Sequence, residues 1–148
     1  MTLIDKTAPS QSETISFELE RRHAPEKVWR ALTDPVLLAE WLLPAIDFKL
    51  EPGAAFKFQT QAMPGWDGVV NCRMLGIEAP TKLSYAWTVG DMALDTVLTF
   101  TLAPMPSGTR LSIVQSGFKP DQKQASGGAR YGWKMMGGKL IDLLARVP

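Results

Sequence analysis

The sequence is poor in the residues that most often build catalytic and metal centres. It has one histidine, His23, and one cysteine, Cys72, among 148 residues. A single cysteine excludes a disulfide within the chain, and no His and Cys residues are spaced as zinc ligands are. His23 lies between the first expected strand and a helix start, where a surface or capping role is expected. Cys72 alternates with Val70 and Met74 on an apolar face, so we expect it to be buried and unreactive.

Charge of one sign and long apolar runs are also lacking. Sixteen basic and fifteen acidic residues give a net charge of +1, without a long run of like charge. This balance argues against a nucleic-acid surface or a polybasic membrane anchor. No stretch approaches the roughly 20 apolar residues of a membrane span, and the first 14 residues contain no apolar core typical of a signal peptide. A cytoplasmic protein without a membrane span is therefore expected, as a monomer or a homodimer.

The groups that bind phosphates or transfer protons are missing from their usual contexts. Gly127-Gly128 follows a polar stretch rather than a strand, so the sequence predicts no nucleotide site and no cofactor. The acidic residues fall in loops or at outward or terminal positions of the expected strands. Since paired carboxylates must point into a site to act as acid and base, an enzyme is the less favoured interpretation.

Alternating apolar and polar residues, which indicate half-buried strands, dominate the chain. The first strand runs to Glu20, after a segment at 1–12 that we expect to be flexible. Two short helices follow, one begun by Pro25 and the other capped by Asp34. Six further strands are expected at 46–50, 54–62, 68–78, 83–88, 98–102 and 111–115. Short turns join them, so the sheet should be antiparallel, and residues 13–148 should form one α+β domain.

The last expected helix, "YGWKMMGGKLIDLL" at 131–144, has an unusual composition. It holds three glycines, and each costs about 1 kcal/mol against alanine inside a helix. On a helical wheel Trp133, Met136 and Leu140 share an apolar arc, with Gly137 in its middle and Gly132 off it. We expect this helix to cover the concave face of a curved sheet of six to seven strands.

Five segments in order carry a family resemblance. They are "APEKVWRALTDPVLLAEWL" (24–42), "EPGAAFKF" (51–58), "APTKLSYAW" (79–87), "GTRLSIVQSGF" (108–118) and "GW" (132–133). Together they resemble the START-like, or SRPBCC, superfamily, and within it the homologues of the heat-shock protein 90 ATPase activator. The resemblance implies a helix-grip fold, in which the sheet curls around a long C-terminal helix and leaves an apolar cavity. It also implies a heat-shock protein 90 chaperone as a possible partner.

The candidate ligand-binding residues are those expected to point between this helix and the sheet. They are Trp41, Phe56, Phe58, Cys72, Tyr85, Trp87, Leu98, Phe100, Ile113, Gln115, Trp133, Met136, Gly137 and Leu140. Ligand pockets are typically apolar with a few polar groups, and Tyr85 and Gln115 would be those groups. The same residues also fit a solid core. Three large apolar residues on expected turns, Met63, Trp66 and Met92, fit a cavity mouth, a dimer contact or the edge of the core.

Three functions follow from these patterns. The first is non-catalytic binding of a small hydrophobic or amphipathic ligand, such as a lipid, between the last helix and the sheet. The second is a chaperone-associated module like the heat-shock protein 90 ATPase activator. The third is a cyclase or hydrolase acting on an aromatic or polyketide-like substrate, which is less favoured because the inward positions lack an acid or a histidine.

Overall fold

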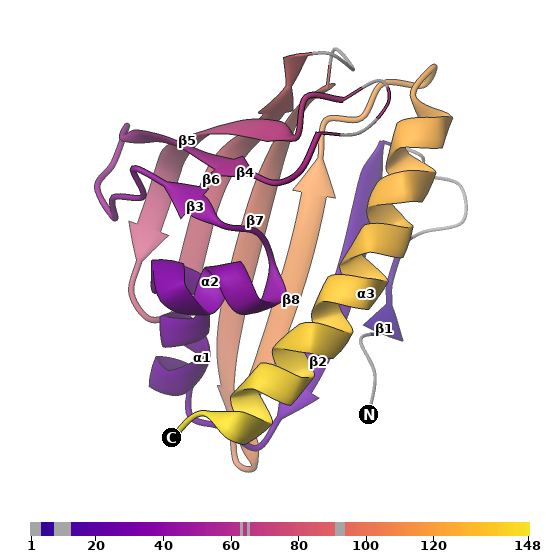
Figure 1. Ribbon diagram of the computed structural model, residues 1–148. Helices are drawn as coiled ribbons and strands as arrows, with labels where there is room; N and C mark the ends of the chain where they lie inside the picture. Colours follow the sequence, from indigo (N-terminus) through magenta and orange to yellow (C-terminus); the bar gives the residue numbers. More distant parts are fainter. Residues whose placement is uncertain (1–3, 8–12, 63, 65, 91–93) are drawn as a thin grey trace.

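The computed structural model describes residues 4–7, 13–62, 64, 66–90 and 94–148, and has the expected helix-grip architecture (Figure 1). One antiparallel sheet has the strand order β1-β2-β8-β7-β6-β5-β4-β3, and the long helix α3 crosses its concave face. The strands are β1 (Ile4–Asp5), β2 (Thr14–Arg21), β3 (Ala45–Ile46), β4 (Ala55–Gln59), β5 (Val69–Glu78), β6 (Lys82–Val89), β7 (Leu94–Met105) and β8 (Gly108–Ser116). The helices are α1 (Pro25–Thr33), α2 (Pro35–Trp41) and α3 (Lys123–Arg146).

The sheet has eight strands, against the six to seven expected, because the two-residue strand β1 adds to one edge. β3 ends at Ile46 rather than at residue 50, since Asp47 takes a left-handed φ of 58° that breaks the extended backbone. β1 lies within the segment expected to be flexible, and Ile4 and Asp5 pair there with β2. Residues 1–3 and 8–12 of that segment lie outside the described residues.

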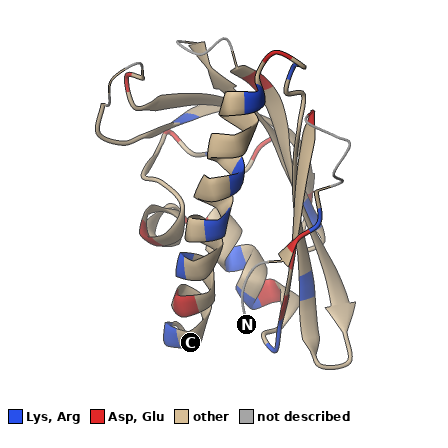
Figure 2. Ribbon diagram, turned by 90° about the vertical axis from the view of Figure 1, so that its right-hand side faces the viewer, with Lys and Arg blue, Asp and Glu red and all other residues tan. Residues whose placement is uncertain are grey.

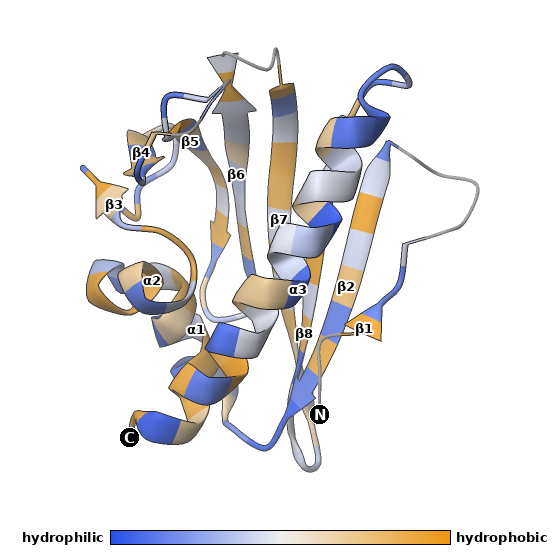
Figure 3. Ribbon diagram, turned by 45° about the vertical axis from the view of Figure 1, so that its right-hand side comes forward, coloured by the Kyte–Doolittle hydropathy of each residue, from blue (hydrophilic) through white to orange (hydrophobic). Residues whose placement is uncertain are grey.

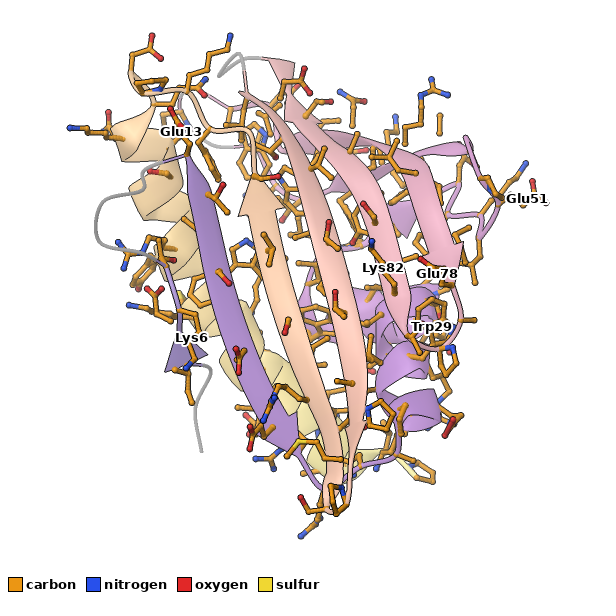
Figure 4. All side chains as sticks on the ribbon, turned by 180° about the vertical axis from the view of Figure 1, so that it is seen from behind. Lys6, Glu13, Trp29, Glu51, Glu78 and Lys82 are labelled. Atoms are coloured by element: carbon orange, nitrogen blue, oxygen red, sulfur yellow. The ribbon has the colours of Figure 1, made fainter. Side chains whose placement is uncertain are left out.

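The two faces of the sheet differ in polarity. On β2, Ile15, Phe17 and Leu19 point to the concave side and are buried. Glu18 and Glu20 alternate with them and point to the convex side, where both lie within 4 Å of the Arg110 guanidinium. Figure 4 shows the convex side, which no helix of the described chain covers. The apolar core therefore lies entirely on the concave side, under the helices.

Helices α1 and α2 close one end of the concave face (Figure 1). The Asp34 side chain caps α2 by accepting a hydrogen bond of 2.9 Å from the backbone N–H of Val36. Trp41, at the end of α2, donates its indole N–H to the Ala31 carbonyl at 2.8 Å. Its ring also packs edge-on against Phe100 of β7, with the ring centroids 6.3 Å apart. This end of the sheet is therefore filled by side chains.

Helix α3 begins at Lys123, a full two turns before the start expected at Tyr131. The early turns contain Gly127 and Gly128 and few apolar residues, so they carry almost no helical periodicity. Figure 3 shows the hydrophobic residues of α3 concentrated in its C-terminal half. There Leu140, Leu143 and Leu144 are fully buried. The C-terminal half thus anchors the helix, and the N-terminal half extends beyond that anchor.

Strand β1 holds the N-terminal half of α3 from one flank. The Asp5 carboxylate lies 2.7 Å from the Arg130 guanidinium and 3.7 Å from the Lys134 ammonium, two of the basic residues spread along α3 in Figure 2. Burial alone would raise the pKa of Asp5, but hydrogen bonds from Thr7 and Arg130 and the Arg130 charge lower it to about 2. This contact positions the helix from outside and leaves its inner face free.

Candidate ligand-binding site

A cavity of about 740 Å³ lies between the N-terminal half of α3 and the concave face of the sheet. Its volume falls within the range of roughly 300–1,000 Å³ that is typical of small-molecule sites. Strands β5 to β8 form its floor, and Leu43 and Trp66 close one side. The lining residues are Leu43, Trp66, Val70, Trp87, Val89, Leu94, Gln115, Asp121, Gln122, Gln124, Ala125, Gly128, Ala129, Gly132, Trp133 and Met136.

The helix wall of the cavity is built from small residues. Four of them recur with helical spacing on one face of α3, namely Ala125, Gly128, Ala129 and Gly132. A Cβ atom on Gly128 would meet no neighbour within 4 Å, and one on Gly132 would meet only the Met136 Cε at 3.7 Å. These glycines therefore face open space and do not serve a close helix–strand contact.

Three of the five tryptophans of the chain line the cavity. The rings of Trp87 and Trp133 lie side by side, with centroids 6.1 Å apart and planes tilted by 49°. Trp66 is fixed by its indole N–H, which donates to the Val69 carbonyl at 3.0 Å. Large rings held in place offer flat apolar surface at low entropic cost, and such surface suits an aromatic or polycyclic ligand.

A chain of buried hydrogen bonds runs along the floor of the cavity. The Trp133 indole N–H donates to Gln115 Oε1 at 2.9 Å, and Gln115 Nε2 donates to the Thr96 hydroxyl at 3.0 Å. The Thr96 hydroxyl in turn donates to the Trp87 carbonyl at 2.8 Å. We did not expect Thr96 from the sequence, although it continues the period-two face of Leu98 on β7. These hydrogen bonds join α3 to β8, β7 and β6 at the cavity.

The cavity lining carries little charge. Among the described residues that line it, Asp121 is the single charged one, and none is a lysine, arginine or histidine. A buried anion needs a counter-charge or several hydrogen bonds. The lining therefore favours an uncharged ligand over a carboxylate or a phosphate.

The sequence-predicted residues divide between the cavity and the core. Four of them line the cavity, namely Trp87, Gln115, Trp133 and Met136. The other ten are buried in the core and do not line it, namely Trp41, Phe56, Phe58, Cys72, Tyr85, Leu98, Phe100, Ile113, Gly137 and Leu140. The space lies nearer the start of α3 than predicted, because the small residues of its first turns leave it open while the leucines of its last turns fill the other half.

Two further predictions concern residues around the cavity mouth and the helix wall. Trp66 does line the cavity, whereas Met63 and Met92 lie outside the described residues. Gly132, expected off the buried face, lies at the cavity wall. The helical wheel placed Gly132 off an apolar arc that has Gly137 in its middle. That wheel began at Tyr131, so it left out Ala125, Gly128 and Ala129, which share the cavity wall with Gly132.

Tyr85 and Cys72 lie in the packed core and not in an accessible site. The Tyr85 ring packs against Phe56 and Phe100, at centroid distances of 5.1 Å and 6.1 Å. Its hydroxyl has no hydrogen-bond partner among the described residues. Burial raises the pKa of the Tyr85 hydroxyl and of the Cys72 thiol well above their ordinary values. Both therefore stay protonated near neutral pH, and neither is a nucleophile or a base there.

Replacing Tyr85 with phenylalanine is expected to raise the free energy of unfolding by about 1 kcal/mol. The change removes a buried hydroxyl that forms no hydrogen bond, and it keeps the ring contacts. Urea denaturation measures the difference. Thr96→Val is the control, since it removes a buried hydroxyl that is bonded and should lower stability. A loss of stability in Tyr85→Phe would show that the hydroxyl has a partner.

His23 does not line the cavity. Its Nδ1 lies 3.3 Å from the Lys27 ammonium, and its carbonyl accepts a hydrogen bond from the Thr109 hydroxyl at the start of β8. Burial and nearby positive charge, that of Lys27 first, lower the pKa of His23.

In the described part of the chain, no group of three or more His, Cys, Asp or Glu residues could hold a metal ion. None of the helices described is long and apolar enough to cross a membrane.

Comparisons with known proteins agree with this architecture. Protein MLL2253 from Mesorhizobium loti has a solved structure that is 43% identical, with a TM-score of 0.83, over 91% of this chain and 98% of that one. Protein CV1439 from Chromobacterium violaceum is 28% identical, with a TM-score of 0.79, over 93% and 100% of the two chains. DynU16, described as a putative protein in the dynemicin biosynthetic locus, is 18% identical and shares the fold, with a TM-score of 0.75 over 90% of this chain and 48% of its own.

Two further comparisons used the sequence. No curated protein is significantly similar to it. Residues 22–145, however, match the family described as Activator of Hsp90 ATPase homolog 1-like protein. This range takes in most of the chain, from the end of β2 to the last turn of α3, and includes every residue that lines the cavity. The chain therefore belongs to the Activator of Hsp90 ATPase homolog 1-like family.

Proposed function

We propose that this protein binds a small, uncharged apolar or amphipathic molecule in the cavity under α3, without transforming it. The observation that carries the proposal is the cavity of about 740 Å³, walled by three tryptophans and by the small residues of the helix. A core that served only as a scaffold would gain stability from larger side chains on this helix face. Glycine and alanine at these positions forgo that gain and keep the space open.

The polar groups of the lining support binding better than catalysis. General acid–base catalysis needs a titratable side chain within hydrogen-bond reach of the reacting group. Among the described lining residues Asp121 alone has a carboxyl group, and it lies just before α3 at an exposed position. The cyclase or hydrolase function is thus less well supported.

A chaperone-associated role is a second candidate, because the matching family is named for an activator of the Hsp90 ATPase. Its test is the ATPase rate of the Hsp90 of the same organism, measured with and without the pure protein. A saturable increase would support that role. An unchanged rate at saturating protein would leave ligand binding as the better supported function.

Native mass spectrometry of protein purified from its own host tests the binding proposal. We expect a retained molecule that is lost on denaturation, and a mass difference that identifies it. The same protein, emptied by denaturation and refolding, should regain thermal stability when that molecule is added back. A protein that is empty on purification and unaffected by a library of uncharged aromatic and lipid-like compounds would contradict the proposal.

A further inference from the structure

The side-chain amide of Gln115 is held in one orientation at the floor of the cavity. Gln115 is 2% exposed and lies between Trp133 and Thr96. An indole N–H can only donate, so the atom of Gln115 that faces Trp133 must be the oxygen. The Thr96 hydroxyl donates its one hydrogen to the Trp87 carbonyl, so it must accept a hydrogen bond from the Gln115 nitrogen. Both ends of the hydrogen-bond chain therefore impose the same orientation.

In this orientation one hydrogen of the Gln115 amide has no acceptor among the described residues. Gln115 Nε2 has two hydrogens, and Thr96 takes one of them. No other described residue accepts from Nε2, while Oε1 already accepts from Trp133. Buried carbonyls often leave a second lone pair unused, but an unused buried N–H is rare. What the floor of the cavity lacks is thus an acceptor.

We propose that the ligand supplies this acceptor as an uncharged oxygen, a carbonyl or an ether, which receives the second N–H of Gln115. This inference rests on the proposed function, because it names the class of molecule that the same cavity selects. A carboxylate or phosphate oxygen would also accept, but the described lining offers no lysine or arginine to balance its charge and places Asp121 nearby. The selected class is therefore a planar, neutral compound that bears a carbonyl or ether oxygen.

Two matched probes test the inference on the unmodified protein. 1-Tetralone and tetralin share one bicyclic frame and differ by a carbonyl oxygen, so their affinities isolate the hydrogen bond. In an NMR titration we expect 1-tetralone to bind about five- to tenfold more tightly, the ratio that one hydrogen bond supports. We also expect 1-tetralone, and not tetralin, to shift one of the two Gln115 side-chain amide protons, while the proton bonded to Thr96 stays in place.

Gln115→Glu, measured at pH 5, removes the donor with little change in shape. Burial raises the pKa of a carboxyl group, so the new side chain is protonated there. Its oxygen can accept from Trp133 and its one O–H can donate to Thr96, which leaves no hydrogen for the ligand. The ratio of the two affinities should fall to about one. Gln59→Glu, the same change at an exposed position of β4 that does not line the cavity, is the control and should keep the ratio.

The outcomes separate this inference from the function beneath it. Equal binding of both probes to the unmodified protein, without a shifted Gln115 proton, would overturn the inference and leave apolar binding intact. A preference for 1-tetralone that survives Gln115→Glu would also overturn it, by assigning the donor to another group. Binding of neither probe would count against both the inference and the proposed function. If Gln115→Glu does not fold, the NMR signature of the unmodified protein decides the matter.

Discussion

Replacing Gly128 with leucine is expected to weaken ligand binding about 100-fold and to leave the fold intact. The new side chain enters the space that the ligand needs, and displacing apolar contact of about the size of a leucine costs roughly 2–3 kcal/mol. It meets no neighbour at its Cβ, and leucine is a better helix former than glycine by most of 1 kcal/mol. Calorimetric titration with the native ligand, or with 1-tetralone, measures the loss.

Gly127 provides a matched control for this experiment. It is the preceding residue of α3, a Cβ there would also meet nothing within 4 Å, and it does not line the cavity. Gly127→Leu should therefore give the same gain in helix propensity and leave the affinity unchanged. If both variants lost affinity equally, the effect would lie in the helix and not in the cavity. If neither did, the ligand would bind elsewhere.

Trp133→Ala is expected to lower the free energy of unfolding by about 3–5 kcal/mol, the usual cost of removing a buried tryptophan. Trp133 is 1% exposed, and its ring packs against Trp87 and Phe100 at centroid distances of 6.1 Å and 6.2 Å. The change also leaves Gln115 Oε1 without its donor, a further cost in a buried site. Urea denaturation followed by circular dichroism measures the difference.

Trp133→Phe separates the two contributions. It keeps an aromatic ring in the core and removes the indole N–H, so we expect a loss of only about 1–2 kcal/mol. A Trp133→Ala variant no less stable than Trp133→Phe would mean that the ring contributes little. Helix α3 would then be held mainly by its C-terminal leucines.

Much of the sheet could be predicted from the sequence because each strand buries one face and exposes the other. The strand expected at 83–88 is β6, Lys82–Val89, and Leu83, Tyr85 and Trp87 are all buried on its concave face. The two short helices were also predicted, since proline and Asp34 mark their starts. These signals are local, so neighbouring residues are enough to specify them.

The position of the cavity could not be predicted in the same way. Periodicity tells which face of an element is buried, but not whether the opposite wall touches it. Gly128 and Ala129 are weak evidence for a helix and no evidence for a void until α3 is placed over the sheet. Trp87 and Tyr85 lie on one face of β6, yet one lines the cavity and the other is in the solid core. Which of these two residues lines the cavity depends on the path of α3 over the sheet, and the pattern of β6 alone does not specify that path.

The order of the strands also governs how the chain assembles during synthesis. Strands β4 to β8 pair with their neighbours in sequence as they emerge, but β2 pairs with β8, for example Thr14 with Ser116. Until β8 has been made, β2 can pair only with the two residues of β1. Contacts between distant segments form late, because forming them requires the loss of entropy that closing a long loop entails. Helix α3 emerges later still, so the cavity beneath it is the last part of the protein to take shape.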